Sequence, residues 1–308
     1  MNRADGESGH GPNTNLSFGL NNQPTGYTYD PSGNMTVEPL SPPNDMTYDG
    51  ENRMTTFSGG GGAASYTYDG NGLRVAKSVT GGSTMVSIFS GSQKIAEYDN
   101  GAATSAPSRE YVAGPTGLLA MIANGTTTYY HQDHLSVRLT TDGNGNLLTQ
   151  QGAFPFGESW YSNQGSGDNW VFTSYDRDSE SGLDYALARY YDSRTGTFCS
   201  ADPLAGDPSD PQSWNRYAYG RNDPIDVTDP SGKHWWSWLL DIGLNAADAA
   251  LSRALFQSTP ARGGRLRYRE TDLVGYIVSI HARGRRWRRC SIPRQLPVSI
   301  HARARRAT

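Results

Sequence analysis

Cysteine is scarce in this chain: Cys199 and Cys290 are the only two among 308 residues. They lie in segments of quite different character, so the sequence predicts neither a disulfide framework nor a zinc site. Hydrophobic residues make up only 35% of the chain, and no apolar run in residues 1–230 is long enough to span a bilayer. The N-terminal residues 1–20 lack the apolar stretch of a secretory signal peptide. These absences argue against a compact helical core, a membrane partner and a disulfide-stapled domain, and no cofactor is predicted.

Lysine is missing from residues 253–308, which contain 14 arginines and only two acidic residues. An arginine-rich tail normally indicates a nucleic-acid or acidic partner. Here, however, the peptide VSIHAR occurs at 278–283 and again at 298–303, and FQSTPARGG occupies 256–264. One DNA string, GTTTCAATCCACGC, encodes Val-Ser-Ile-His in one frame and Phe-Gln-Ser-Thr in the next, which resembles a translated CRISPR repeat array. The tail, residues 256–308, is therefore predicted to be disordered, with at most nonspecific contact to nucleic acid.

Glycine and tyrosine, by contrast, are abundant, with 36 and 18 residues. Four Tyr-Asp pairs follow one another at intervals of 19, 20 and 30 residues: Tyr29–Asp30, Tyr48–Asp49, Tyr68–Asp69 and Tyr98–Asp99. A period near twenty indicates a repeat architecture. Alternating Tyr, Thr and Val residues favour pleated strands, and the Asp, Asn and Gly residues that follow favour hairpin turns. Each Asp is therefore predicted to cap a turn and each Tyr to lie on a sheet face.

One segment contains two histidines whose spacing is compatible with metal ligands. His131 and His134 flank Asp133, but the alternation of a strand places the two imidazoles on opposite faces. No cysteine or further histidine lies nearby in the sequence to complete a site. The sequence therefore predicts no metal.

Residues 185–235 read YALARYYDSRTGTFCSADPLAGDPSDPQSWNRYAYGRNDPIDVTDPSGKHW. Each Asp-Pro or Pro-Ser-Gly piece alone is ordinary turn chemistry. In this order, however, RYYD, GTF, ADPL, NRYAYGRNDP and DPSG closely resemble the repeat-associated core of the Rhs/YD-repeat family. The resemblance implies a large β-structured shell around a C-terminal toxin. Several members of the family also cut their own chain by an aspartate-based reaction, which frees the toxin inside the shell. The resemblance therefore implies that this chain is a candidate for the same self-cleavage.

The resemblance and the composition together predict a mainly β fold: an antiparallel YD-repeat sheet with a core plug, one short α-helix and a disordered basic tail. The predicted segments are a disordered N-terminus at 1–20, a YD-repeat shell fragment at 21–160, the repeat-associated core at 161–233, a short helical remnant of the variable region at 234–255 and the tail at 256–308. The helical remnant is too short for a toxin domain. Within the core, Cys199 is predicted to be a small buried residue, and Tyr217 and Tyr219 are predicted to face one side of a strand.

Aspartic catalysis needs two carboxylates close enough to share a proton, one ionised and the other protonated. The resemblance places these on Asp192 of RYYD and Asp202 of ADP, with Arg189 as a charge partner. Asp226 and Asp229 remain as alternatives. The sequence alone does not show which of these carboxylates lie close together.

Cleavage in the family follows a DPxGL pattern, just past the glycine. The match here is DPSGK, so the bond would be the one between Gly232 and Lys233, with a lysine where the family has a leucine. Because aspartic catalysis depends on tight geometry, weak or no self-cleavage is predicted. The chain is therefore expected not to act as an enzyme; if it does, the expected activity is aspartic-type self-cleavage near Gly232–Lys233.

The leading functional prediction is a structural shell and core segment of an Rhs-type toxin-delivery protein whose toxin domain is missing or truncated. Three alternatives stay open: a self-cleaving aspartic peptidase core that releases a C-terminal peptide, a carbohydrate-binding YD-repeat module and a degraded gene remnant. The partners that the resemblance implies are the rest of the shell and the chain's own toxin region; no motif identifies an immunity or secretion partner. Intact family members are bacterial and are secreted or displayed on the cell surface.

Overall fold

The computed structural model describes residues 16–114, 117–133, 135–163, 169–204 and 206–233. The chain divides into two units, residues 1–240 and 241–308. The second unit lies outside the described residues, as do the predicted helix at 234–255, the predicted tail at 256–308 and Cys290.

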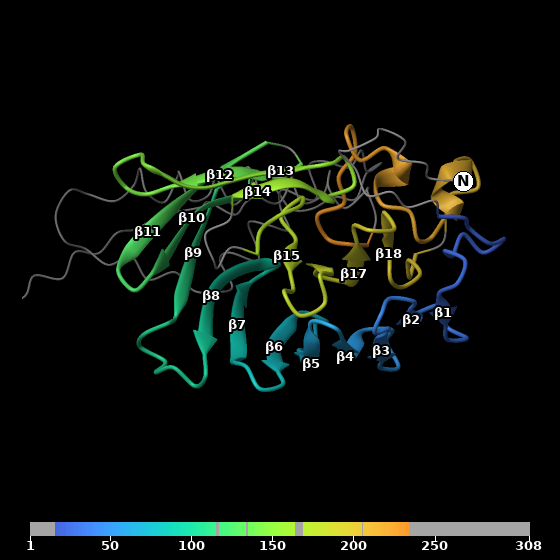
Figure 1. The fold of residues 1–308 in the computed structure, drawn as a ribbon, viewed down its shortest axis with the longest axis horizontal. Coiled ribbons are helices and arrows are strands. Elements are labelled where there is room, and N and C mark those ends of the chain that lie inside the picture. Colours follow the sequence, from blue (N-terminus) through green and yellow to red (C-terminus); the bar gives the residue numbers. More distant parts are fainter. Residues whose placement is uncertain (1–15, 115–116, 134, 164–168, 205, 234–308) are drawn as a thin grey trace, which may run out of the picture. The chain divides into compact units, whose positions relative to one another are not determined.

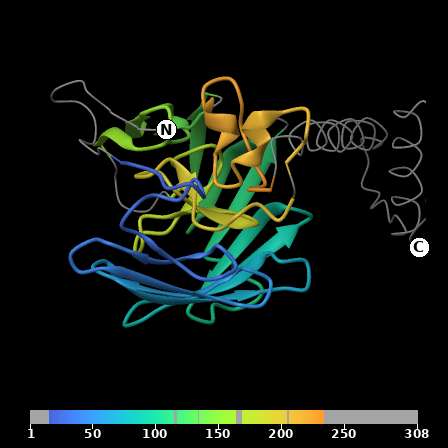
Figure 2. The same ribbon diagram turned by 90° about the vertical axis from the view of Figure 1, so that its right-hand side faces the viewer.

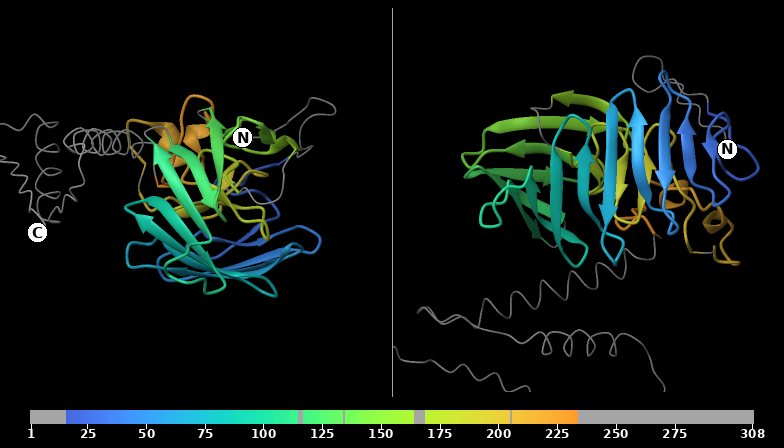
Figure 3. Two further views of the ribbon diagram at one scale, coloured as in Figure 1. Left: turned by 90° about the vertical axis from the view of Figure 1, so that its left-hand side faces the viewer. Right: turned by 90° about the horizontal axis from the view of Figure 1, so that it is seen from below.

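Fourteen strands form one antiparallel sheet, the large sheet, in which each strand pairs with its neighbours in the chain (Figure 1). The strands are β1 (Thr28–Tyr29), β2 (Met35–Glu38), β3 (Asn44–Tyr48), β4 (Met54–Gly59), β5 (Gly62–Tyr68), β6 (Arg74–Val79), β7 (Thr84–Ser90), β8 (Gln93–Asp99), β9 (Arg109–Gly114), β10 (Gly117–Ala123), β11 (Thr126–Gln132), β12 (Val137–Thr141), β13 (Leu147–Ala153) and β14 (Ser159–Asn163). The right-hand view of Figure 3 shows the strands side by side. The predicted mainly β, antiparallel fold is confirmed. Within the described residues the helices are two short 3-10 turns, η1 (Pro211–Trp214) and η2 (Gly220–Asn222).

The aspartates of the first three Tyr-Asp pairs cap hairpin turns, as predicted. The carboxylate of Asp49 accepts a hydrogen bond from the backbone N–H of Arg53, at 3.0 Å. Asp30 and Asp69 accept the same bond from the residue four positions further on, at 2.8 and 2.9 Å. Such bonds satisfy backbone donors that the tight turn would otherwise leave unpaired.

Two aspartates depart from this pattern. Asp99 ends β8, and its carboxylate pairs with Arg109 on β9 at 2.7 Å. Asp142 follows a threonine, yet it accepts hydrogen bonds from the backbone N–H groups of Asn144 and Asn146 at 2.8 and 2.9 Å. The capped turn therefore depends on the aspartate and the turn residues after it, and a preceding tyrosine is not required.

The tyrosines of the first three pairs lie on one face of the large sheet, also as predicted. Tyr29, Tyr48 and Tyr68 pack against a buried cluster that joins the first strands to a later part of the chain. The buried members of this cluster are Met35, Met46, Met54, Phe57, Ala64, Tyr66, Leu183, Tyr185, Tyr190 and Cys199. Cys199 is fully buried here, so its prediction as a small core residue is confirmed. The inner face of the large sheet is thus covered by residues more than 100 positions away in the sequence.

The later part of the chain forms a second, four-stranded antiparallel sheet, the core sheet. Its strands are β15 (Asp176–Arg177), β16 (Asp184–Ala186), β17 (Arg189–Asp192) and β18 (Thr197–Phe198). Every residue of β16, β17 and β18 is buried. A second buried cluster packs here, formed by Phe172, Tyr175, Ala186, Tyr191, Phe198 and Tyr219. In Figure 2 this yellow segment lies between the blue and the green strands of the large sheet.

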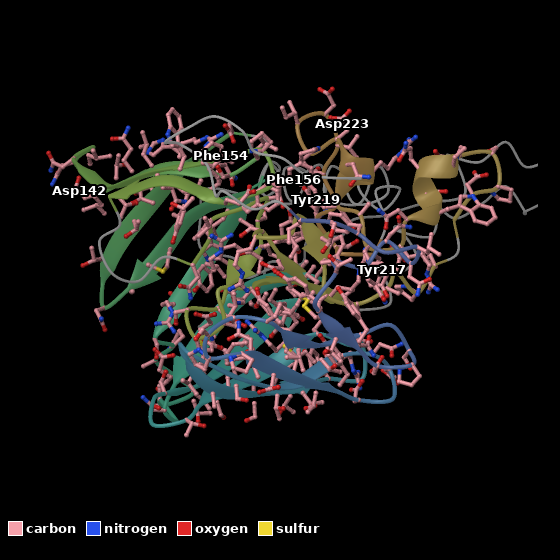
Figure 4. The ribbon with its side chains drawn as sticks, turned by 45° about the vertical axis from the view of Figure 1, so that its right-hand side comes forward. Asp142, Phe154, Phe156, Tyr217, Tyr219 and Asp223 are labelled. Carbon is pink, nitrogen blue, oxygen red and sulfur yellow. The ribbon has the colours of Figure 1, made fainter. Side chains whose placement is uncertain are left out.

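The prediction of a strand through Tyr217 and Tyr219 is wrong. Arg221 and Asn222 have positive φ angles of 60° and 63°, which a strand does not accommodate, and the chain turns into η2. Tyr217 packs edge-on against Tyr29, with 5.9 Å between the ring centroids. Tyr219 lies instead in the aromatic cluster of the core sheet (Figure 4). The two rings therefore stabilise different contacts, one with the large sheet and one within the core.

A buried ion network fastens the core sheet to the large sheet. It consists of Arg74 and Lys77 on β6, Lys94 and Glu97 on β8, and Asp176, Asp178 and Glu180 of the core. None of these side chains is more than 9% exposed. Lys77 Nζ lies 2.8 Å from Asp178 Oδ1, and Lys94 Nζ lies 2.5 Å from Asp176 Oδ2. Buried charges are tolerated only when they are paired. The core is therefore stable only in the position where its acids meet the cations of β6 and β8.

The ionisation of these groups reflects their pairing. Burial by itself would raise the pKa of Asp176, but Lys94 and Arg74 outweigh burial and lower that pKa to about 2. Burial likewise opposes the charged form of Lys94, yet Asp176 and Glu97 raise its pKa. Both partners are therefore ionised at neutral pH.

Replacing Asp178 by Asn should destabilise the fold severely. The change keeps the size of the side chain but leaves Arg74 and Lys77 buried without their shared counter-charge, and breaking such a buried pair costs about 3–5 kcal/mol. Urea unfolding followed by circular dichroism measures the loss. Glu51→Gln is the control, because Glu51 is 74% exposed in its pair with Arg53 and should change the free energy of unfolding by less than about 1 kcal/mol. Equal effects of the two substitutions would show that the network does not hold the core in place.

Candidate functional site

The guanidinium of Arg189, on β17, is the centre of a buried polar site. Arg189 is 5% exposed and lies over the ring of Phe198, 3.7 Å from the ring centroid. Its Nη2 donates to Asp202 Oδ2 at 3.1 Å and lies 3.5 Å from Asp229 Oδ2. Its Nε donates to the carbonyl oxygen of Gly232. One buried cation therefore gathers two carboxylates and one peptide carbonyl.

Asp202 is held through its backbone by Arg216. The N–H of Asp202 donates to the Arg216 carbonyl at 2.9 Å, and Arg216 Nε donates back to the Asp202 carbonyl at 2.7 Å. Arg189 Nη1 donates to the same Arg216 carbonyl at 3.0 Å. Arg216 therefore ties Asp202 and Arg189 together, a role that the sequence did not indicate.

Asp229 is held by the turn that follows it. The N–H of Gly232 donates to the Asp229 carbonyl at 3.3 Å, and the Tyr175 hydroxyl donates to the same carbonyl oxygen. Ser231 Oγ lies 3.4 Å from Asp229 Oδ1. These contacts fix the position of the Asp229 carboxyl relative to the peptide bonds of its own turn.

The two carboxylates of the site are not equivalent. Burial raises the pKa of Asp229; Arg189 opposes this rise and Asp202 adds to it. Asp202 has the shorter of the two ion pairs with Arg189, at 3.1 Å. A pair in which one carboxyl group favours the proton and the other pairs with a cation can supply an acid and a base.

The peptide bond after Gly232 lies within the site. Gly232 is buried with φ at 63°, and an added Cβ would lie 2.4 Å from the Ala186 carbonyl oxygen. Lys233 is exposed, and its backbone N–H is near enough to the Asp229 carboxyl to lower the pKa of that group. The carbonyl of this peptide bond is therefore in contact with Arg189, and its N–H lies near Asp229.

The structure brings four of the predicted residues together as the Arg189 site: Arg189, Asp202, Asp229 and Gly232. Asp192, which the resemblance pairs with Asp202, lies apart, and its carboxylate accepts from Arg194 Nε at 2.9 Å. Because they stand three positions apart on β17, Arg189 and Asp192 face opposite sides of the strand. The odd spacing of Arg189 and Asp192 in the sequence could therefore have shown that Asp192 does not face the same side of the strand as Arg189. Asp226 is exposed, and its backbone N–H lies 3.3 Å from the carboxylate of Asp223, which Figure 4 labels.

A cavity of about 610 Å³ lies beside Arg216. Its lining includes the polar side chains of Asn21, Asn22 and Asp30 and the ring of Trp214. Trp214 is 62% exposed, so a large aromatic surface is available there to a ligand.

Among the described residues, no group of three or more His, Cys, Asp or Glu side chains is placed to hold a metal ion. His131 Nε2 lies 3.0 Å from Thr141 Oγ1, and His134 is outside the described residues. In the part of the chain that the structure describes, no helix has the length and apolar character needed to cross a membrane.

No protein-family model matches the chain. The chain is, however, 32% identical over 255 residues to the tRNA3(Ser)-specific nuclease WapA of Bacillus spizizenii and 31% identical over 255 residues to the tRNA nuclease WapA of Bacillus subtilis. Each match covers 79% of this chain and 11% of the relative. The chain therefore spans about a tenth of the length of these relatives.

Solved structures show the same architecture. The Photorhabdus luminescens Tc holotoxin pore matches with a TM-score of 0.53 and 17% identity, over 66% of this chain and 10% of that chain. This chain shares the β-sheet architecture of the matched tenth of that chain. A crystal structure of TcdB2–TccC3 also matches with a TM-score of 0.53, at 19% identity over 66% of this chain and 11% of that chain. At such low identity, the likeness to the Tc toxin structures concerns the β-sheet architecture and not the chemistry of the Arg189 site.

Replacing Gly232 by Ala should distort the Arg189 site and destabilise the fold. The new Cβ would meet the Ala186 carbonyl at 2.4 Å, and a residue other than glycine is strained at this positive φ, so a loss of about 1–3 kcal/mol is expected. Urea unfolding measures it. Gly143→Ala is the matched control, because an added Cβ there meets nothing within 4 Å and should change the stability by about 0.5 kcal/mol or less. If both variants unfold at the same urea concentration, the backbone at Gly232 is not constrained as described.

Proposed function

We propose that this chain is the closing segment of an Rhs-type toxin-delivery shell and that it cuts its own backbone between Gly232 and Lys233. One observation carries the cleavage proposal: the Gly232 carbonyl contacts a buried guanidinium that two carboxylates flank. The similarity to WapA nucleases and to the β-sheet architecture of part of the Tc toxin chains supports the shell proposal. The cargo would be the chain that follows Lys233, and the proposed partners are the rest of the shell and that cargo.

The shell role rests on how the two sheets cover each other. The large sheet contributes buried cations and an apolar inner face, and the core sheet contributes acids and aromatic rings. Among the described strands, β1 and β14 each have only one neighbour. Open sheet edges accept further strands, so a longer shell would continue from these edges while the core closes it from inside.

In the proposed reaction, a water molecule attacks the carbonyl carbon of Gly232, and Asp202 takes a proton from that water. Negative charge then develops on the Gly232 oxygen, where Arg189 Nε already donates. Asp229, whose protonated form burial favours, gives its proton to the Lys233 nitrogen as the C–N bond breaks. The immediate products are a Gly232 carboxylic acid and a Lys233 amine, with one proton passed from Asp229 to the amine and one from water to Asp202. The new carboxylic acid then gives its proton to the amine, which leaves a Gly232 carboxylate and a Lys233 ammonium group.

Lys233 does not prevent this reaction in the proposed geometry. It replaces the family leucine, which predicts weak cleavage, but the residue is exposed, so its ammonium group stays in water. The chemistry concerns the Gly232 carbonyl, which accepts from Arg189, and the Lys233 N–H, which lies near Asp229. We therefore expect measurable cleavage of the wild-type chain.

Intact-mass spectrometry of the full chain, taken over time after purification, tests the cleavage proposal. The wild type should yield two products that separate at Gly232–Lys233. Asp202→Asn and Asp229→Asn should each slow cleavage by about a hundredfold or more, because each removes one member of the acid–base pair. Asp192→Asn should cleave at the wild-type rate, since Asp192 lies outside the Arg189 site.

Two results would contradict this assignment. A wild-type chain that stays intact would refute the self-cleavage and leave the shell proposal standing. Cleavage that Asp192→Asn abolishes and Asp229→Asn retains would support the carboxylate pair that the family resemblance implies.

A second candidate function, saccharide binding, is favoured by the cavity beside Arg216. Its volume of about 610 Å³ is in the range of ligand pockets. The cavity that the exposed residue Trp214 lines is also lined by Asn21, Asn22 and Asp30. An aromatic face beside such hydrogen-bonding groups suits a ligand with one apolar ring face and several hydroxyls.

A glycan array probed with the full chain tests this candidate. Binding is expected for the wild type and should be lost in Trp214→Ala. Trp160→Ala is the control, because Trp160 is similarly exposed, at 58%, but lies on β14. Absence of wild-type binding, or binding that Trp214→Ala retains, would remove the saccharide candidate.

A further inference from the structure

A second pair of buried carboxylates lies outside the Arg189 site and shares one arginine. Arg194, in the turn after β17, places its Nε 2.9 Å from Asp192 Oδ1 and its Nη2 2.8 Å from Glu38 Oε2. Asp192 ends β17 of the core sheet, and Glu38 ends β2 of the large sheet. Asn44, on β3, donates to the same Glu38 oxygen at 2.8 Å. One guanidinium thus connects the core sheet to the first strands of the large sheet.

The charges of this group do not balance. The carboxylate side chains of Glu38 and Asp192 are 1% and 0% exposed, whereas Arg194 is 35% exposed. Within the described part of the chain, Glu38 Oε1 and Asp192 Oδ2 have no hydrogen-bond partner. If both acids were ionised, one net negative charge and two unsatisfied oxygens would be buried, which is strongly unfavourable. A bound proton removes the excess charge and supplies a donor.

A second cation, Arg177, acts on Asp192 from β15, but its own partner is Asp184. The titratable groups around the two carboxylates are Tyr27 before β1, Tyr29 on β1, Arg177 on β15, Asp184 on β16, Arg194 after β17 and Cys199 after β18. Arg177 is already paired with Asp184 at 2.7 Å. Burial first, and Asp192 and Glu38 next, raise the pKa values of Tyr27 and Cys199, so both stay neutral.

We propose that Glu38, Asp192 and Arg194 form a proton-binding clasp. With one proton bound to its carboxylates, the clasp holds the core sheet against β2 and β3, and loss of that proton weakens the contact. The proposal goes beyond the proposed cleavage, since no hydrogen bond in the described chain joins a clasp residue to the Arg189 site.

The ionisation of Glu38 agrees with this geometry. Burial raises its pKa most and Asp192 raises it further, while Arg194 and Asn44 lower it, and the value is about 7. An unfolded chain would release the same proton near the ordinary pKa of about 4.3. Between these two values the folded state binds one more proton than the unfolded state, so the contribution of Glu38 to stability is full below this window and falls as the pH rises through it.

Urea unfolding of the full chain from about pH 5 to about pH 7 measures this proton. The logarithm of the unfolding equilibrium constant should rise with pH more steeply in the wild type than in Glu38→Gln, by up to about one unit per pH unit. Glu110→Gln, at an exposed glutamate on β9, is the control and should keep the wild-type slope. Equal slopes for the wild type and Glu38→Gln would overturn the proposal.

Infrared spectroscopy provides a second measurement that does not require Glu38→Gln to fold. A protonated carboxyl group has its own carbonyl band, and the pH at which a band disappears reports the pKa of its group. Asp192→Asn removes the neighbouring negative charge, so the Glu38 band should disappear at a pH lower by about one unit. A pH difference spectrum identical in the wild type and Asp192→Asn would also overturn the clasp.

Discussion

The pairing of buried cations on the large sheet with buried acids of the core is the interaction on which the rest of the structure depends. The cations project from the inner face of β6 and β8, where an unpaired charge is too unfavourable to bury. The acids that meet them come from one short stretch of the core, namely Asp176, Asp178 and Glu180. Apolar contacts would tolerate a shifted core, but each of these ion pairs holds only at one position. We infer that the network determines where the core lies on the sheet.

Two arginines of the core, Arg189 and Arg194, each pair with two buried carboxylates, but in the described part of the chain only Arg189 also contacts a peptide carbonyl. Arg189 gathers Asp202, Asp229 and a peptide carbonyl, so its charge faces a bond that can be broken. Within the described residues, Arg194 pairs with two carboxylates and with no peptide carbonyl, so the proposed chemistry of its cluster is proton binding and not cleavage. The difference follows from β17 itself, because residues at its two ends face opposite sides.

The proposed cleavage depends on the folded core for a further reason. The peptide bond to be cut and one of the carboxylates belong to a single short turn, Asp229–Lys233, which reaches Arg189 only when the core sheet is assembled. An unfolded core has neither the buried guanidinium nor the unequal carboxylates. In the proposed shell, closure by the core would therefore come before cleavage, and the buried ion network would contribute indirectly to the reaction by fixing the core.

The sequence by itself determined the local structure. The capped turns after Asp30, Asp49 and Asp69, the antiparallel order of the strands and the burial of Cys199 all follow from patterns within a few residues. Family motifs pointed to Arg189 and Asp202 and to the bond after Gly232. Only the tertiary structure decided which second carboxylate joins them, because Asp229 is 40 residues from Arg189 whereas Asp192 is three residues away on the opposite face of its strand. The ion network and the clasp likewise join segments about 80 to 160 residues apart, and such contacts arise from the packing of two sheets, which no local sequence pattern contains.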